Sequence, residues 1–294
     1  MSHRWFSAGS SCMAFSTSLL LVASLASFGD AGAQAAEEGR PIRALLVCGG
    51  CCHDYAQQKE ILTKGISERA NVEFTIAYDP VATKEHKNPV YDSPDWAKDF
   101  DVVVHDECSG KVTDPETIDR ILKPHRGGLP AVVLHCGIHS YGRDAWPKMT
   151  PWFEFTGLPS TAHGALAPIA IHFVDESSPI TKGMADWTTI REELYNNAAG
   201  KVLDTAHGLA RGKQTTKDKS GKSTTANYVV VWTNFYRGKT RVFATTIGHN
   251  DQTVADPRYL DLVTRGLLWS VDKLDDAHLK RVKKSSAEPS QAGR

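Results

Sequence analysis

Residues 42–50 read Ile-Arg-Ala-Leu-Leu-Val-Cys-Gly-Gly, and this stretch decides the fold. Its apolar run is nearly continuous, which is typical of a parallel strand that is buried on both faces. The glycine pair ends the strand. A helix is expected from about residue 56 to 70, because Ile61, Leu62 and Ile66 fall on one of its faces. A buried strand followed directly by a helix predicts an α/β fold.

Three further apolar segments predict the rest of a sheet. Strands are expected at residues 72–78, 101–105 and 131–134. A helix should separate the last two strands, with Asp114 as its N-cap and Pro115 at its first position. This order of elements predicts a doubly wound, mostly parallel sheet with helices on both faces.

The second half of the chain has weaker patterns. Strands are expected at residues 169–174, 228–233 and 241–247, and Asp256-Pro257 should open a last helix. Residues 212–225 are polar and contain four lysines, and we interpret them as a solvated hairpin tip.

The two ends of the chain have patterns that differ from those of a folded domain. Arg4, the short apolar stretch at residues 19–26 and Ala33-Gln34-Ala35 together resemble a signal peptide that is cut after Ala35. We therefore expect a signal peptide at 1–35, one domain at 36–275, and a polar, disordered tail at 276–294. Cleavage would release the mature protein into the periplasm or the medium, without a membrane anchor.

The net charge of the chain argues against nucleic acid as a partner. The chain carries 34 basic and 34 acidic residues, so its formal net charge is zero. A neutral protein without a basic patch is not expected to bind nucleic acid. Nothing in the sequence indicates its oligomeric state.

Polar and reactive residues follow several of the predicted strands. In an open parallel sheet, ligands bind beyond the carboxyl ends of the strands, so these residues should meet at one edge. The residues that follow the strands are His53, Asp54, Tyr55, His105, Glu107, Cys108, His135, Cys136, His139, His249 and Asn250. A functional site is expected at that edge.

The same motifs carry a family resemblance over residues 42–271. Gly-Gly followed by His53-Asp54-Tyr55 resembles the GHD-type opening of ThuA-like (trehalose utilisation) domains, and Glu192-Glu193-Leu194-Tyr195 is similar to their DELY motif. His135-Cys136-Gly137, the segment from Arg241 to His249 and Leu267-Leu268-Trp269 resemble three further family motifs. The resemblance implies a fold related to class I glutamine amidotransferases.

The sequence departs from those amidotransferases at the nucleophile. They place a cysteine on a sharp turn between strand and helix. Here the matching position is His135, and Cys136 comes one residue late. Glutamine hydrolysis by a thiolate is therefore not expected.

The resemblance implies a small carbohydrate substrate, because ThuA-like proteins are associated with disaccharides and their oxidised keto forms. Imidazoles and a carboxylate can move protons near neutral pH, so we expect acid/base isomerisation or related processing of a keto-sugar. The expected catalytic residues are His53, His139, Glu193 and His249. The expected substrate-binding residues are Asp54, Tyr55, Glu107, His135, Tyr195 and Asn250.

Two alternatives stay open. His53, His139 and His249 can instead hold a divalent metal that activates water, which would make the protein a metal-assisted hydrolase. A sugar-binding module without catalysis is the other alternative. No other cofactor is expected. His163 and His172 are interpreted as structural or exposed residues.

The cysteines allow more than one pairing. Cys48 lies within the first apolar strand and is expected to be a core residue. A disulfide can form among Cys51, Cys52, Cys108 and Cys136, but sequence cannot choose the pair.

Overall fold

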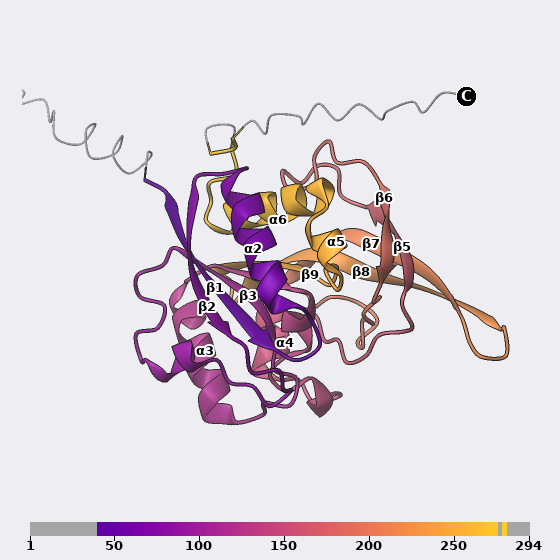
Figure 1. Cartoon of the computed structure of the whole chain (residues 1–294), viewed down its shortest axis with the longest axis horizontal. Helices are drawn as coiled ribbons and strands as arrows, with labels where there is room; N and C mark the ends of the chain where they lie inside the picture. Colours follow the sequence, from indigo (N-terminus) through magenta and orange to yellow (C-terminus); the bar gives the residue numbers. More distant parts are fainter. Residues whose placement is uncertain (1–39, 276–277, 281–294) are drawn as a thin grey trace, which may run out of the picture. The chain divides into compact units, whose positions relative to one another are not determined.

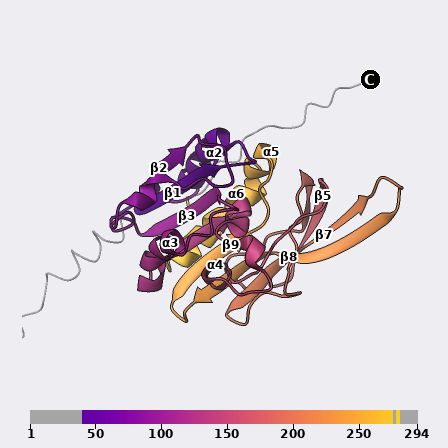
Figure 2. The same ribbon diagram turned by 90° about the horizontal axis from the view of Figure 1, so that it is seen from below.

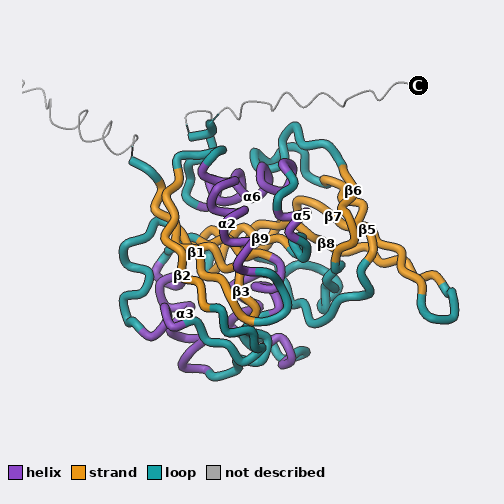
Figure 3. Tube along the Cα trace, viewed as in Figure 1, coloured by secondary structure: helices purple, strands orange, loops and turns teal. Residues whose placement is uncertain are grey.

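The computed structural model of the chain describes residues 40–275 and 278–280 (Figures 1 and 3). The chain divides into Met1–Arg40 and Pro41–Arg294, and the second unit contains every element named here. Its strands are β1 (Ile42–Gly50), β2 (Val72–Asp79), β3 (Val102–Cys108), β4 (Ala131–Leu134), β5 (Ala167–Phe173), β6 (Trp187–Glu192), β7 (Ala206–Lys217), β8 (Ser223–Tyr236) and β9 (Thr240–Thr245). Its α-helices are α2 (Tyr55–Ser67), α3 (Pro115–Gly127), α4 (Pro151–Thr156), α5 (Asp251–Val254) and α6 (Pro257–Ser270). Three short 3-10 helices are η1 (Pro89–Asp92), η2 (His135–His139) and η3 (Arg143–Ala145).

The described residues form one nine-stranded sheet in the order β2-β1-β3-β4-β9-β8-β7-β5-β6. The first five strands are parallel, as the sequence predicts. The other four are joined antiparallel to their neighbours. The sheet is therefore mixed, and the parallel prediction holds for β2, β1, β3, β4 and β9. In Figure 2 the two halves extend to opposite sides of β9.

Two apolar cores cover the two faces of the parallel half. Successive side chains of a strand point to opposite faces. Ala44 and Leu46 of β1 therefore pack with α2 and α6, whereas Leu45 and Val47 pack with α3 and α4. All four side chains are at most 1% exposed, which explains the unbroken apolar run of β1. The predicted helices on both faces are confirmed (Figure 2).

Caps fix the helices where the sequence predicts them. Asp114 accepts a hydrogen bond from the backbone nitrogen of Thr117, and Asp256 caps α6 in the same manner through Arg258. Gly128, in the left-handed conformation, closes α3. These side chains satisfy backbone donors that a helix end leaves without partners.

The sequence pattern does not predict all strands of the antiparallel half. β6 and β7 are absent from the sequence prediction, because their sequences contain neither an apolar run nor a regular alternation of apolar and polar residues. Most of the polar segment 212–225 belongs to the β7–β8 ladder, and the turn itself spans only residues 218–222. Asp218 closes that turn by accepting hydrogen bonds from the backbone of Ser220 and Lys222.

Both predicted terminal segments fall mainly outside the described residues. The signal peptide at 1–35 lies wholly outside them, as do residues 276–277 and 281–294 of the predicted tail. The described part, residues 278–280, pairs with the chain after α2, where Leu279 bridges Ala70. Among the described helices, none has the length and apolar character needed to cross a membrane.

Candidate functional site

Three histidines meet at the carboxyl edge of the parallel strands. His53 follows β1, His135 follows β4, and His249 follows β9. The His53 ring lies 4.7 Å from the His135 ring and 5.0 Å from the His249 ring, measured between centroids. The antiparallel half contributes Glu193, which follows β6. Side chains from both halves of the sheet therefore build one site.

Glycines at two strand ends permit this convergence. Gly50 has a φ of +89°, and a Cβ there would come within 2.2 Å of the Cys108 carbonyl oxygen. Gly248 has a φ of +126°, and a Cβ there would come within 2.8 Å of the Tyr259 hydroxyl. Only glycine adopts these conformations at such close approach without strain.

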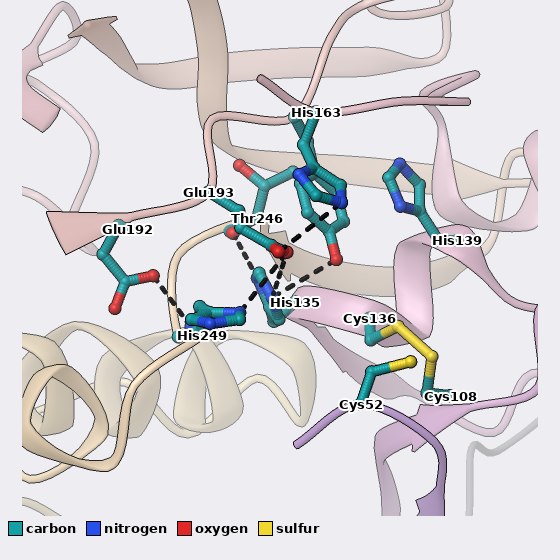
Figure 4. A network of polar contacts seen from close by, with 12 residues as sticks. Cys52, Cys108, His135, Cys136, His139, His163, Glu192, Glu193, Thr246 and His249 are labelled. Atoms are coloured by element: carbon teal, nitrogen blue, oxygen red, sulfur yellow. Dashed lines mark hydrogen bonds and ion pairs between the residues drawn. A yellow bond between two sulfur atoms is a disulfide. The ribbon is translucent and has the colours of Figure 1, made fainter. Parts of the chain in front are cut away.

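Glu193 lies at the centre of the site and contacts three of its histidines (Figure 4). Its Oε2 lies 3.4 Å from His135 Nε2 and 3.4 Å from His249 Nδ1. Its Oε1 lies 3.5 Å from His163 Nε2. One carboxylate thus faces three imidazoles, and its side chain is only 13% exposed.

His135 is held in one orientation by the backbone. Its φ is +38°, an unusual value for a residue other than glycine, as the matching elbow position requires. Its Nδ1 donates a hydrogen bond to the Thr246 carbonyl oxygen at 2.7 Å. The Tyr195 hydroxyl lies 3.2 Å from Nε2. Because Nδ1 carries the proton of the neutral ring, Nε2 turns its lone pair toward Glu193.

Two acceptors therefore face each other in the neutral state, His135 Nε2 and the Glu193 carboxylate. A proton on Nε2 or a cation between the two atoms would remove this conflict. The ligand atoms of His53, His135, Glu193 and His249 all lie within 4.8 Å of one another. His53 Nδ1 is buried and has no hydrogen-bond partner among the described residues, whereas the buried His249 Nδ1 faces Glu193 Oε2 at 3.4 Å. These four residues fit a divalent metal, with Thr246 fixing one ligand from behind.

The surroundings shift the pKa values of the titratable groups in different directions. Burial alone would raise the pKa of Glu193, but the contacts with the His135 and His249 imidazoles outweigh it and lower that pKa. The hydrogen bond to Glu193 raises the pKa of His249 against the effect of partial burial. Burial, and then the neighbouring imidazoles, lower the pKa of His53 to about 2. At neutral pH Glu193 is therefore ionised and His53 is neutral.

Glu192 fixes the His249 turn. Its side chain is fully buried, and its two oxygens accept the backbone N–H groups of His249 at 2.8 Å and Asn250 at 3.0 Å. The Asn250 side chain donates in turn to the Arg191 carbonyl oxygen. Adjacent glutamates thus have separate tasks, since Glu192 binds the backbone of the turn and Glu193 binds its imidazole.

His139 lies behind this cluster. Its ring stacks on Tyr195 with centroids 3.7 Å apart, and its Nε2 lies 2.8 Å from the Ser160 hydroxyl. Burial and the charge of Arg143 lower its pKa. The metal-ligand set expected from sequence, His53, His139 and His249, is therefore corrected. His135 takes the place of His139, because the His139 ring stacks on Tyr195 and contacts Ser160, whereas His135 Nε2 lies 3.4 Å from Glu193.

The remaining predicted residues are divided between the site and its surroundings. Asp54 lines the cavity beside His53, but its carboxylate also caps α2 by accepting from Gln57. Tyr55 is buried, with its ring 5.7 Å from that of His53. Glu107 points into a separate buried network, where it accepts from Tyr91 at 2.6 Å and contacts His105 at 2.9 Å. Glu107 thus supports the fold below the edge and does not join the histidine cluster.

A cavity of about 510 Å³ opens at the cluster. Its lining residues are Cys52, His53, Asp54, His249, Asn250 and Asp251. This volume lies within the range of small-molecule sites. A larger cavity of about 950 Å³ lies between α3 and residues 141–151 and includes none of the four clustered residues, so it is not the candidate site.

Sequence reasoning missed two residues of the site. The His163 side chain is 38% exposed, as the sequence predicts, but it also contacts Glu193 from a loop that bridges Tyr195. Glu192 had no assigned role. The adjacent Glu192-Glu193 pair in the DELY-like motif was the available signal for Glu192. The loop around His163 has no periodic pattern that could have placed it.

These features define an α/β protein with a histidine and glutamate site at the carboxyl edge of a parallel half-sheet. The family model ThuA, described as trehalose utilisation, matches residues 43–270, and the chain belongs to this family. The resemblance seen in the motifs is thereby confirmed.

Three solved structures are similar to the chain. A ThuA-like protein of Bacteroides uniformis is similar with a TM-score of 0.57 and 15% identity, over 82% of this chain and 96% of that one. The CTPS glutaminase domain of Trypanosoma brucei has a TM-score of 0.41 and 12% identity, over 81% and 100% of the two chains. A glutamine amidotransferase of Thermotoga maritima has a TM-score of 0.41 and 10% identity, over 79% and 98%. No curated protein matches the chain.

Proposed function

We propose that this ThuA-family protein is an enzyme that processes a small carbohydrate, such as a disaccharide or its keto form, by acid/base chemistry. The observation that carries the proposal is Glu193, whose carboxylate lies within 3.5 Å of three imidazoles beside an open cavity. Membership of the trehalose utilisation family supports a sugar as the substrate.

The residues have different roles in this proposal. His249 exchanges a proton with the sugar, because its raised pKa keeps a protonated fraction near neutral pH. Glu193 stays ionised and orients His249 and His135, since its lowered pKa makes it a weak base. His53, with a pKa of about 2, acts as a neutral hydrogen-bonding group and not as the base. Asn250 and Asp54 line the cavity that receives the sugar.

Turnover of plain and oxidised disaccharides by single variants tests the proposal. We expect Glu193→Gln and His249→Gln each to lower kcat by about 10²–10⁴-fold, the usual range for lost acid/base catalysis. Glu193→Gln should also move the basic limb of the pH profile to lower pH, because His249 loses the interaction that raises its pKa.

His172→Asn is the matched control. His172 pairs with Asp186 on the far strands of the sheet and is 68% exposed, so its loss should leave turnover unchanged. If Glu193→Gln and His249→Gln remain as active as this control, the acid/base proposal is wrong. If the wild-type protein binds a sugar in calorimetry but converts none, it is a binding module.

A metal-assisted reaction is the second candidate, favoured by the 4.8 Å convergence of His53, His135, Glu193 and His249. A bound divalent ion would polarise a carbonyl group or activate water. Elemental analysis of the purified protein separates the candidates. One equivalent of metal that disappears in His135→Ala supports the second, and metal-free protein with full turnover supports the first.

Export remains a part of the proposal that rests on sequence. The supporting features are Arg4, the apolar stretch 19–26 and the Ala33-Gln34-Ala35 site. The intact mass of the mature protein from its native host should correspond to a chain that starts at Ala36. A mass that includes the first 35 residues would contradict export by cleavage.

A further inference from the structure

Four cysteines gather beside the histidine cluster, at the carboxyl ends of the three neighbouring strands β1, β3 and β4. Cys51 is bonded to Cys52, and Cys108 is bonded to Cys136. The parallel register pairs Gly50 of β1 with Cys108 of β3 and brings the two disulfides together. Figure 4 shows Cys52 next to the Cys108–Cys136 bond.

The two disulfides touch through their sulfur atoms. Cys51 Sγ lies 3.4 Å from Cys108 Sγ, and the sulfurs of Cys51, Cys52 and Cys108 all lie within 4.8 Å of one another. The backbone of Cys51 also donates to the Cys108 carbonyl oxygen at 3.3 Å, which holds the pair in register. A thiolate at Cys51 would therefore already be beside a disulfide sulfur that it can attack.

Exposure differs sharply between the four residues. Cys51, Cys108 and Cys136 are only 7%, 4% and 6% exposed. Cys52 is exposed and lines the cavity of about 510 Å³. A reagent in solution thus reaches the cluster at Cys52, and the Cys108–Cys136 bond lies behind it.

We propose that this cluster is a thiol–disulfide exchange centre that passes two electrons from an external dithiol, entering at Cys52, to the buried Cys108–Cys136 disulfide. This activity goes beyond the proposed sugar chemistry and does not depend on it. The substrate is a dithiol compact enough to enter the cavity, or one on a protruding loop of another protein.

The exchange is balanced in four displacement steps. An external thiolate attacks Cys52 Sγ, breaks the Cys51–Cys52 bond and releases the Cys51 thiolate. The second external thiolate then attacks the external sulfur that is bound to Cys52, which closes the external disulfide and frees the Cys52 thiolate. The Cys51 thiolate attacks Cys108 Sγ and expels the Cys136 thiolate. The Cys52 thiolate attacks Cys51 Sγ, restores the first disulfide and expels the Cys108 thiolate. The dithiol is oxidised, and Cys108 and Cys136 are reduced and take up its two protons.

Timed reduction with dithiothreitol, followed by acid quench, alkylation and peptide mass mapping, tests the proposal. In the Cys51→Ser/Cys52→Ser double variant, we expect reduction of Cys108–Cys136 to slow by at least ~10-fold, because direct attack must reach a buried sulfur. Cys48→Ser is the control, since Cys48 is a free buried thiol and its loss should leave the rate unchanged.

A single variant traps the intermediate. In Cys52→Ser the Cys51 thiol has no partner, so we expect a Cys51–Cys108 disulfide with Cys136 alkylated. The same linkage should appear transiently in the wild-type protein at early quench times, which keeps the test valid if the variant fails to fold. The exchange is excluded if the double variant is reduced at the wild-type rate, or if no Cys51–Cys108 linkage forms in any sample.

Discussion

Glu193 shows how one residue acquires its properties from its neighbours. Burial opposes its charge, but two imidazoles within 3.4 Å compensate and keep it ionised. The same contact raises the pKa of His249. Perturbed pairs of this kind are typical of functional sites, because opposite shifts assign separate tasks to the two groups.

A second buried carboxyl, Asp106 on β3, has the opposite shift. Burial, and then the charge of Glu107, raise its pKa from 3.8 to about 7, and its Oδ2 has no hydrogen-bond partner among the described residues. The folded state therefore retains a proton that the unfolded chain releases. The stability contributed by this group is complete below pH ~4 and is lost as pH rises toward ~7.

Asp106→Asn should remove this dependence. From pH 4.5 to pH 8, the free energy of unfolding of the variant should rise relative to that of the wild type by on the order of 3 kcal/mol. Urea denaturation at both pH values measures the difference. A difference that is the same at both values would mean that Asp106 does not titrate in the folded protein.

At the scale of elements, the site depends on how strands end. Gly50 ends β1 with its Cα against the Cys108 backbone, and Gly248 follows β9 with its Cα against Tyr259. Each close approach directs the next polar residues, Cys51 to His53 and His249, toward the shared edge. The glycines at the strand ends are therefore needed to place the side chains of the site.

Gly50→Ala should test this dependence. A Cβ would meet the Cys108 carbonyl oxygen at 2.2 Å, whereas a Cβ at Gly200 would meet no described atom within 4 Å at a similar left-handed φ. Gly200→Ala should cost ~1 kcal/mol from backbone strain alone. Gly50→Ala should cost at least ~2 kcal/mol more because β1 and β3 must separate. Equal thermal shifts of the two variants would contradict the close approach.

At the scale of the whole molecule, β1 connects the two cores. Leu46 packs with α2 and α6, and Leu45 packs with α3 and α4. Neighbouring residues of one strand thus contribute to opposite faces, so we expect the two cores to unfold together.

Leu45→Ala and Leu46→Ala should therefore each lower the midpoint of unfolding, and each variant should unfold in a single transition. Each should cost about 2–5 kcal/mol, the range for large-to-small core changes. Ser220→Ala at the tip of the β7–β8 turn should stay within ±0.5 kcal/mol, as expected for a surface position. Near- and far-ultraviolet circular dichroism should give coincident curves. Two separated transitions in either leucine variant would show that the cores unfold independently.

Sequence by itself determined the parallel half of the fold. Apolar runs, caps and glycine pairs report on nearby residues, so they located β1, β3 and β4 and the starts of α3 and α6. They also placed His53, His135 and His249 after strands, at one edge. The β6 and β7 strands escaped prediction because their polar, half-exposed residues depend on neighbours in the sheet.

Only the tertiary structure decided which residues meet. The sheet order brings Glu193 from the antiparallel half to His135 and His249, and a loop without pattern brings His163. The contacts of His139 with Tyr195 and Ser160, and not the sequence spacing, keep it out of the cluster that His135 joins. The β1–β3 register decides that Cys51 touches Cys108. Periodicity records which face of a segment is buried, whereas contacts between distant segments depend on the packing of the whole chain.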